Sequence, residues 1–494
     1  MEIQAKGGDA LREVTPVLVV GCCEGEPAGP ICREVDAALG GVLAGAYESR
    51  TFTGKPNQTL LVHTLGRIQA ERVLFVGLGK RRDLTPERVR QAAGSAARAL
   101  RLPGITGYCT LLHHAGENAP TFVQATVEGS LLGGYAFEQY KTKQDEIVPD
   151  AHVTLLFPDQ EAAAQAEGAL REGRAVAEAT RFARDLVNQP GNVATPTYLA
   201  EQALELAGKF GIACRILERE ELERLGMEGL LAVGKGSRQP PKFIILEYRG
   251  AEAQRRPTVL VGKGVTFDSG GISLKPREGM ERMKDDMAGA AAVLGTLRAA
   301  AALGLPVNLV GLVPAAENMP DGGAYKPGDL IRTMAGLTVE IVNTDAEGRM
   351  LLCDALHYAR HYKPVALIDL ATLTGACLVA LGTCASGLLG NDPGLLRALK
   401  AAGETCGERL WELPLWEEYG ELMKSDIADL KNAGGPHAGT ISAAWFLRQF
   451  ADTARWAHLD IAGTAWEEKG KHYLPKGATG VGVRLLVEYL KRVP

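Results

Sequence analysis

The stretch TVEIVNTDAEGRMLLCDALHYAR, residues 338–360, joins an apolar run to a helical pattern through an acidic loop. The run Thr338–Val342 is short and β-branched, as expected of a strand. The segment Met350–Arg360 has the composition and apolar spacing of a helix. A strand followed directly by a helix is the unit of an α/β sheet. The stretch therefore predicts an α/β fold with polar side chains beyond the end of a strand.

The same alternation of apolar strands and helices continues through the second half of the chain. Met287–Ala302 is a further predicted helix, and nearly continuous apolar strands favour a largely parallel core sheet. The other strands predicted here are Phe243–Glu247, Thr258–Val261, Val307–Leu312, Val365–Leu370 and Trp456–Ile461. The apolar residues 366–390 include Asp369 and several glycines, so we expect a buried strand plus a loop and no membrane span.

The first third of the chain also alternates strands with helices. Its predicted strands are Val14–Val20, Arg72–Val76 and His152–Phe157, and a helix capped by Thr85 should extend to about Leu100. A long helix is expected over residues 160–186, before the breaker VNQPG at 187–191.

With 494 residues the chain is too long for one core. We predict two α/β domains, each with a mixed or mostly parallel sheet flanked by helices. Their expected limits are 1–160 for an N-terminal domain with an assembly or regulatory role, 161–190 for a linker helix, and 191–494 for the domain that carries the chemistry.

The composition is that of an ordinary soluble protein. The net charge of −5 argues against a dedicated nucleic-acid binder. Nine cysteines without a CxxC pair indicate reduced thiols, and the polar N-terminus resembles no signal peptide, so we expect a cytoplasmic protein.

The segment VGKGVTFDSGG, residues 261–271, superficially resembles a phosphate-binding loop. Phe267 stands where a dinucleotide fingerprint needs its third glycine, and Gly264 follows Lys263 where a Walker A loop needs Ser or Thr. Nucleotide binding at this loop is therefore not expected. Pairing of Lys263 with Asp268 and a role of Lys263 in a metal site both remain open on the residues alone.

Acidic residues gather after the predicted strands. One loop contains Asp345, Glu347 and Arg349. Burying such charges costs several kcal/mol each in lost hydration unless cations compensate. Asp285 and Asp286 could merely favour a helix N-terminus. Carboxylates without a paired His or a Cys cluster predict a hard-ligand site for Mn, Mg or Zn.

The histidines do not add ligands to this site. His357 and His361 have zincin spacing, but Tyr358 stands where the catalytic Glu is required. We assign no role to His437 or His458.

Three motifs together resemble the leucyl aminopeptidases of peptidase family M17, also called cytosol aminopeptidases. They are GKGVTFDSGG at 262–271, KDDMAGAAAVLG at 284–295 and NTDAEGR at 343–349. The resemblance continues in RDLVN at 184–188, TPTYLA at 195–200, DLKNAGG at 429–435, AGTI at 438–441 and KGATGVGVR at 476–484. It is close over roughly residues 165–490, whereas the N-terminal domain matches in layout only.

The resemblance implies a di-metal exopeptidase that releases N-terminal, preferably leucine-like, residues. Lys263, Asp268, Asp286 and Glu347 would hold the tighter metal, and Asp268, Asp345 and Glu347 the more exchangeable one. Lys275 and Arg349 match the catalytic Lys and Arg, with Arg349 as the holder of a bicarbonate base. The pocket for the first side chain would comprise Met283, Thr372, Gly375, Ala462 and Ala465.

The family further implies two divalent ions per subunit, Mn or Zn with Mg and Co as alternatives, and a homohexamer. Peptides with a free N-terminus would be the partners, and no membrane partner is expected. DNA binding by the N-terminal domain is an alternative that we do not favour. It rests on seven basic residues, Lys80, Arg81, Arg82, Arg88, Arg90, Arg98 and Arg101, which a solvated helix explains as well. A di-metal phosphoesterase is a second alternative.

Overall fold

The computed structural model describes residues 2–25, 29–116, 120–143, 148, 150–451 and 454–493. The chain forms two compact units, and both are α/β, as predicted. Unit 1 comprises Met1–Arg181 and Glu468–Lys476, and unit 2 comprises Phe182–Glu467 and Gly477–Pro494. The division falls within helix α6, Glu167–Asn188.

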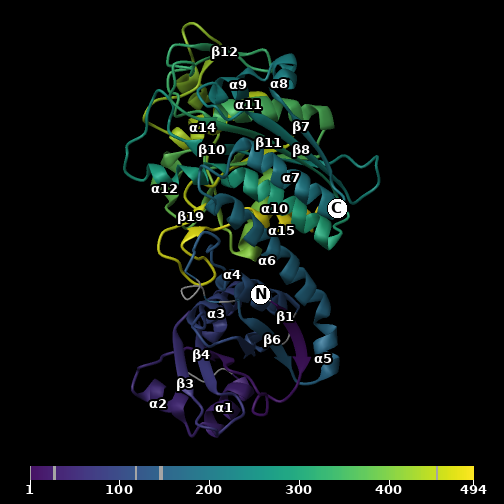
Figure 1. Ribbon diagram of the computed structural model, residues 1–494, viewed down its shortest axis with the longest axis vertical. Helices are drawn as coiled ribbons and strands as arrows, with labels where there is room; N and C mark the ends of the chain where they lie inside the picture. The colour runs from purple at the N-terminus through teal and green to yellow at the C-terminus, as the bar shows by residue number, and fades with distance from the viewer. Residues whose placement is uncertain are drawn as a thin grey trace. The chain divides into compact units, whose positions relative to one another are not determined.

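The sheet of unit 1 has the strand order β1-β6-β5-β2-β4-β3. All neighbours are parallel except β3 and β4, which pair antiparallel at one edge. The strands are β1 Ile3–Gly7, β2 Leu18–Cys23, β3 Thr59–His63, β4 Arg72–Gly79, β5 Gly107–Thr110 and β6 His152–Phe157. Helices cover both faces of this sheet (Figure 1).

Alternate residues of the central strands enter two different cores. Val19 and Leu74 pack with helices α3, Pro86–Ala99, and α4, Pro120–Gly133, whereas Val20 and Phe75 pack with α1, Gly29–Ala38, and α2, Val42–Glu48. Burial on both faces explains why these strands are continuously apolar in sequence. Strand β2 begins later than predicted, because Val14 is exposed and Pro16 has no N–H for a ladder.

Helix α3 starts as predicted, with the Thr85 hydroxyl accepting a hydrogen bond from the Arg88 amide. Its arginines are not all solvated, because Arg90 is only 4% exposed and its Nε lies 2.7 Å from Glu128 Oε2. Arg90 is therefore not available to contact a DNA phosphate. DNA binding by this segment stays an alternative that we do not favour.

The helix predicted over residues 160–186 is two helices. Helix α5, Gln160–Gln165, precedes α6, and the Ala166 amide between them is shared by the carbonyls of Ala162 and Ala163. This tightened turn interrupts the helix where the sequence pattern shows no breaker.

The main sheet of unit 2 has the order β16-β15-β18-β14-β9-β11-β8-β7. Its centre, β18-β14-β9-β11, is parallel as predicted, and β8 and β7 extend it antiparallel. The strands are β7 Ala213–Leu217, β8 Lys242–Arg249, β9 Thr258–Gly262, β11 Asn308–Asn318, β14 Ala366–Ala371, β15 Ser386–Gly390, β16 Leu410–Glu412 and β18 Trp456–Asp460. Strand β10, Gly264–Asp268, pairs with β11 beyond the end of β9.

Helices also cover both faces of this sheet (Figure 1). One layer contains α7 Pro196–Phe210, α10 Ala288–Leu303, α13 Pro393–Cys406 and α15 Val483–Leu490, and the other contains α9 Glu228–Gly234, α11 Gly348–Tyr358 and α14 Gly439–Ala451. Among the described residues, one helical segment, Met280–Leu303, has the length and apolarity to cross a bilayer, but 78% of its apolar window is buried within the fold. Such burial is what a central helix of the fold requires.

Two local predictions need correction. Residues 366–390 form more than a strand and a loop, because Thr374 caps a short helix, α12 Gly375–Leu381, and β15 follows it. The predicted strand Thr338–Val342 is shorter, β13 Thr338–Glu340, and belongs to a separate small sheet with β12 Leu330–Arg332 and β17 Leu430–Lys431. The side chain of Asn432 accepts from the Val342 amide and so ends the ladder there.

Glycines set the distance between α3 and α4 in unit 1. A Cβ on Gly129 would lie 2.2 Å from the Arg90 carbonyl oxygen. We predict that Gly129→Ala destabilises the protein by about 1–3 kcal/mol, because two helix backbones would have to separate. Thermal unfolding of the full chain measures this. Gly168→Ala is the control, because Gly168 is exposed on α6 and a Cβ there would meet open space. The melting temperature of this variant should stay unchanged or rise slightly. Equal effects of the two substitutions would contradict the packing argument.

Candidate metal centre

The predicted site residues come together at the carboxyl edge of the unit 2 sheet. Lys263 directly follows β9, and Asp268 is the last residue of β10. Asp345 and Glu347 precede α11, and Asp286 lies in the 3-10 segment Met280–Met287 before α10. Parallel strands all end at the same edge, which is where α/β sheets form their sites.

Lys263 lies at the centre of the acidic side chains. Its Nζ is 2.6 Å from Asp286 Oδ1 and 2.8 Å from Glu347 Oε1, and it donates to the carbonyl oxygen of Thr372 at 2.9 Å. The adjacent acid in the sequence, Asp285, instead has its Oδ2 at 3.9 Å from Arg282 Nη2. The geometry therefore separates Asp286 from Asp285, which the sequence pattern could not do.

Lys275 joins the remaining carboxylates to this cluster. Its Nζ is 2.8 Å from Asp268 Oδ2 and also pairs with Asp345 Oδ1. Ligand oxygens of Asp268, Asp286 and Glu347 all lie within 4.8 Å of one another, and all three residues are buried. Four carboxylates and two lysines thus form one connected cluster.

Neighbouring polar groups hold these carboxylates in place. Asn318, at the end of β11, donates from Nδ2 to Asp268 Oδ1 at 2.8 Å and to the Thr344 carbonyl at 3.0 Å. The Thr372 hydroxyl donates to Asp286 Oδ1 at 2.7 Å. Asn318 was not among the predicted site residues, because the strand predicted from the sequence ended at Leu312, six residues before the observed end of β11.

The electrostatics of the cluster are dominated by burial. Burial raises the pKa of Asp286 well above its ordinary value, against the opposing charge of Lys263. Burial also opposes the charge on Lys263, but the neighbouring carboxylates, Asp286 foremost, outweigh it and raise its pKa. Asp286 Oδ2 is buried and has no hydrogen-bond partner among the described residues. An oxygen-rich donor set with such an atom fits a divalent cation.

Arg349 lies in the first turn of α11 beside these acids. It is 7% exposed, and burial lowers its pKa to about 10 although Glu347 opposes this. Within the described part of the chain, its Nε and Nη1 have no hydrogen-bond partner. A buried guanidinium with unused donors suits a small planar anion.

Of the residues predicted for the first side-chain pocket, Thr372 contacts the cluster. Thr372 touches it through both Lys263 and Asp286. Met283 lies in the 3-10 segment, Gly375 is exposed at the start of α12, and Ala462 and Ala465 follow β18, with Ala465 only 2% exposed.

His458, to which no role was assigned, is buried inside the sheet. Its Nδ1 lies 2.5 Å from Asp369 Oδ1, and Trp456 Nε1 donates to the other oxygen of Asp369 at 2.7 Å. These contacts join β14 to β18, so they account for His458 as a structural residue.

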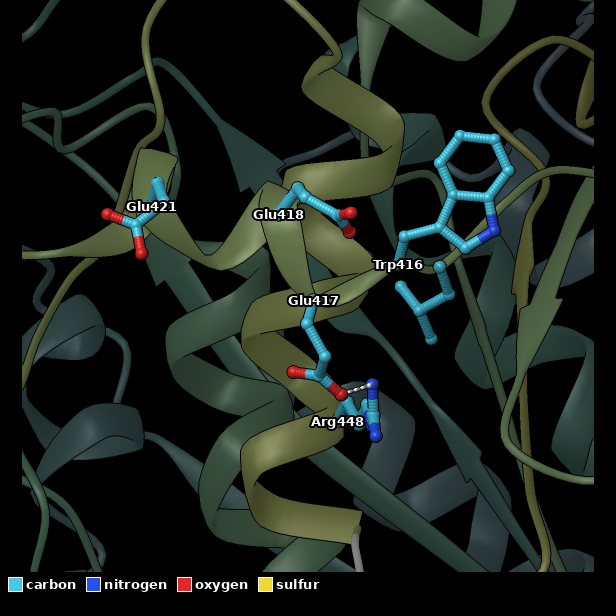
Figure 2. Close-up of a pocket in the computed structure, with 6 residues that line it drawn as sticks. Trp416, Glu417, Glu418, Glu421 and Arg448 are labelled. Carbon is cyan, nitrogen blue, oxygen red and sulfur yellow. Dashed lines mark ion pairs between the residues drawn. The ribbon is translucent and has the colours of Figure 1, made fainter.

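A broad, shallow hollow of about 910 Å³ lies elsewhere on unit 2, around Trp416 (Figure 2). Its polar lining is Glu417, Glu418 and Glu421 with Arg448, whose Nη1 pairs with Glu417 Oε1 at 2.8 Å. None of the predicted site residues lines it, and it is no part of the metal centre.

Comparison with known proteins gives one consistent family. Residues 181–487 match the model of the cytosol aminopeptidase family catalytic domain, and residues 19–144 match that of its N-terminal domain. A probable cytosol aminopeptidase of Geobacter sulfurreducens is 60% identical over 99% of both chains. The cytosol aminopeptidase of Pseudomonas aeruginosa is 49% identical over 98% of this chain and 97% of that protein.

Solved structures agree with the sequence comparison. The bottromycin maturation enzyme BotP in complex with Mn has a TM-score of 0.85 at 38% identity, covering 97% of this chain and 99% of the other. A tomato leucine aminopeptidase variant has a TM-score of 0.89 at 33% identity, covering 100% and 97%. These similarities and the acidic cluster support divalent-metal binding.

Because Gly348 has no side chain, it leaves room for the side chain of Lys263. A Cβ at this position would lie 2.6 Å from Lys263 Cε and 2.8 Å from its Nζ. We predict that Gly348→Ala displaces the amine from Asp286 and Glu347 and lowers metal content at least about tenfold, as loss of a group that orients ligands does. Elemental analysis of the purified protein measures this. Gly322→Ala, at an exposed position with open space, should keep the full metal content; full metal content in Gly348→Ala as well would refute the argument.

Proposed function

The chain belongs to the cytosol aminopeptidase family and is an aminopeptidase, and from this premise we propose that it releases leucine-like N-terminal residues with two divalent cations. Lys263, Asp268, Asp286, Asp345 and Glu347 would hold the cations, with Asp268 and Glu347 shared between them. The observation that carries the proposal is the single cluster of buried carboxylates around Lys263 and Lys275. Mn or Zn is the proposed metal, with Mg and Co as alternatives.

When bound, the cations would polarise the scissile carbonyl and lower the pKa of a water molecule towards neutrality. Lys263 can serve as a ligand only as a neutral amine, because an ammonium has no lone pair. The Lys263 nitrogen lies beside two of the proposed ligand carboxylates, those of Asp286 and Glu347.

Lys275 would stabilise the negative charge that develops on the carbonyl oxygen. Its ammonium is favoured by the carboxylates of Asp268 and Asp345, which outweigh its burial and raise its pKa, so it keeps its charge at neutral pH. A preorganised cation at this position is worth a few kcal/mol of barrier, on the order of an oxyanion-hole donor.

Arg349 would hold a bicarbonate ion, which would supply the general base. Its buried Nε and Nη1 are charged donors that no described residue uses, and charge-assisted N–H donors suit a carbonate-like anion. This proposal is consistent with a centre whose carboxylates are committed to lysines and cations.

Specificity would depend on Met283, Thr372, Gly375, Ala462 and Ala465. These residues are small or apolar apart from the Thr372 hydroxyl, which donates to Asp286. A leucine-sized side chain therefore meets no buried charge from these five. We further propose a cytoplasmic homohexamer, as the family resemblance implies; light scattering of the purified chain tests the assembly.

Metal removal tests the proposed function. We predict that exhaustive chelation abolishes release of leucine from Leu-Gly and that Mn or Zn restores it. Leucyl substrates should exceed acidic ones in kcat/KM, and a phosphate monoester should not be hydrolysed. Full activity after chelation would refute the proposal that the enzyme depends on metal ions. The Asp345→Ala variant should be as inactive as the chelated protein, even with added metal. Asp321→Ala is the control and should remain active, because Asp321 is an exposed acid in a loop.

Replacing Lys275 separates charge stabilisation from metal binding. We predict that Lys275→Ala lowers kcat about 100-fold or more, since loss of one oxyanion-stabilising group has this effect. Metal content should stay near two per chain, because Lys275 donates no ligand in the proposed site. Stopped-assay kinetics and elemental analysis on one preparation measure both. An unchanged kcat would exclude Lys275 from the chemistry.

A further inference from the structure

A second pocket lies at the opposite, amino edge of the unit 2 sheet. It has a volume of about 340 Å³ and is formed where β9, β11 and β14 begin, between α13 and the residues that follow α15. Lys263 and the acidic cluster follow the other end of β9. The two features are therefore separate.

Four arginines line this pocket, namely Arg255, Arg256, Arg455 and Arg492. Two of them are partly neutralised, since Arg455 Nη2 lies 3.0 Å from Asp392 Oδ1 and Arg492 Nη2 lies 2.7 Å from Glu488 Oε1. In the described part of the chain, Arg255 and Arg256 have no ion pair, and Arg255 Nη2 is buried without a hydrogen-bond partner. The pocket thus has unneutralised positive charge and an unused donor.

Arg255 is held in place by the surrounding fold. Asn308, the first residue of β11, donates from Nδ2 to the carbonyl oxygens of Arg255 and Glu252 at 2.8 and 2.7 Å. Arg255 Nη1 donates to the Pro306 carbonyl at 3.1 Å. A positively charged group fixed in this way is preorganised for an anion, because little side-chain entropy remains to be lost on binding.

Apart from the four arginines, Thr258 and Asn308, the lining is apolar. Val307 and Leu395 are buried, and Val365, Ala398 and the ring of Tyr489 complete the wall. The volume lies at the lower end of the range for small-molecule sites, roughly 300–1,000 Å³. A ligand that matches this pocket therefore combines an anionic group with a compact apolar or aromatic body.

The number of guanidinium groups favours phosphate over carboxylate. A carboxylate is satisfied by one guanidinium fork, whereas the three terminal oxygens of a phosphate monoester accept from several forks at once. We propose that this arginine-lined pocket binds a small organic phosphate monoester with a ring-containing body, such as a nucleoside monophosphate. The site is independent of the metal centre and of the proposed peptidase mechanism.

Isothermal titration of the metal-loaded full chain tests the proposal. The probes are AMP and phenyl phosphate, with adenosine and inorganic phosphate as the isolated halves of the ligand; monophosphates are chosen because they compete weakly for divalent cations. We expect saturable binding of at least one monoester, tighter than either half, that weakens as salt is raised.

Three variants make the test specific. Arg256→Ala should raise the Kd about tenfold, as loss of one charge-assisted contact does. Arg397→Ala is the matched control, because Arg397 is exposed on α13 outside the lining. Ala398→Phe fills the volume without changing the charge and should also raise the Kd. Melting temperature and metal content show that each variant is folded.

Several outcomes would overturn the proposal. Absence of saturable binding of both monoesters at millimolar concentration excludes the site. Equal affinity of wild type and Arg256→Ala places any binding elsewhere. Inorganic phosphate binding as tightly as AMP, with no effect of Ala398→Phe, would show an anion site without a place for an organic body.

Discussion

The contact of Lys263 with Asp286 and Glu347 is the interaction around which the catalytic unit is arranged. Carboxylates with such small separations repel one another, and burial adds a desolvation cost that only opposite charge can offset. The Lys263 ammonium and that of Lys275 supply this charge within the chain. The backbone leaves room for it through glycines, since Gly348 faces the Lys263 side chain and Gly289 lies against its amide.

The sequence predictions that were confirmed concern the strands of the two sheets. Strand β6 was predicted with its observed bounds, and β9 to within one residue, because each is a mostly buried parallel strand with a short apolar run. The pattern did not account for Glu347 in the same way, because the strand before it, β13, belongs to a separate small sheet, and only the folded structure brings Glu347 to Lys263. The full set of acids was proposed from the family resemblance, because the pattern alone could not separate Asp286 from Asp285.

The pairing within the cluster was not available from the sequence. Lys263 contacts Asp286 and Glu347, whereas Asp268 contacts Lys275, and this division depends on how β10 turns away from β9 to pair with β11. Strand β10 follows β9 after a single residue, so no local pattern separates the two. The support of Asp268 by Asn318 is likewise a contact across 50 residues, which only the folded sheet creates.

Strand β9 connects the acidic edge of the sheet to the arginine-lined pocket at its other edge. A five-residue strand spans roughly 16 Å, so a ligand in that pocket would touch neither substrate nor metal. It could affect the chemistry only by moving β9, β11 or β14, and parallel ladders hold these three strands together. Packed sheets of this kind deform little, because their interiors are close-packed. Ligand binding at the amino edge should therefore add to the stability of the unit rather than alter turnover.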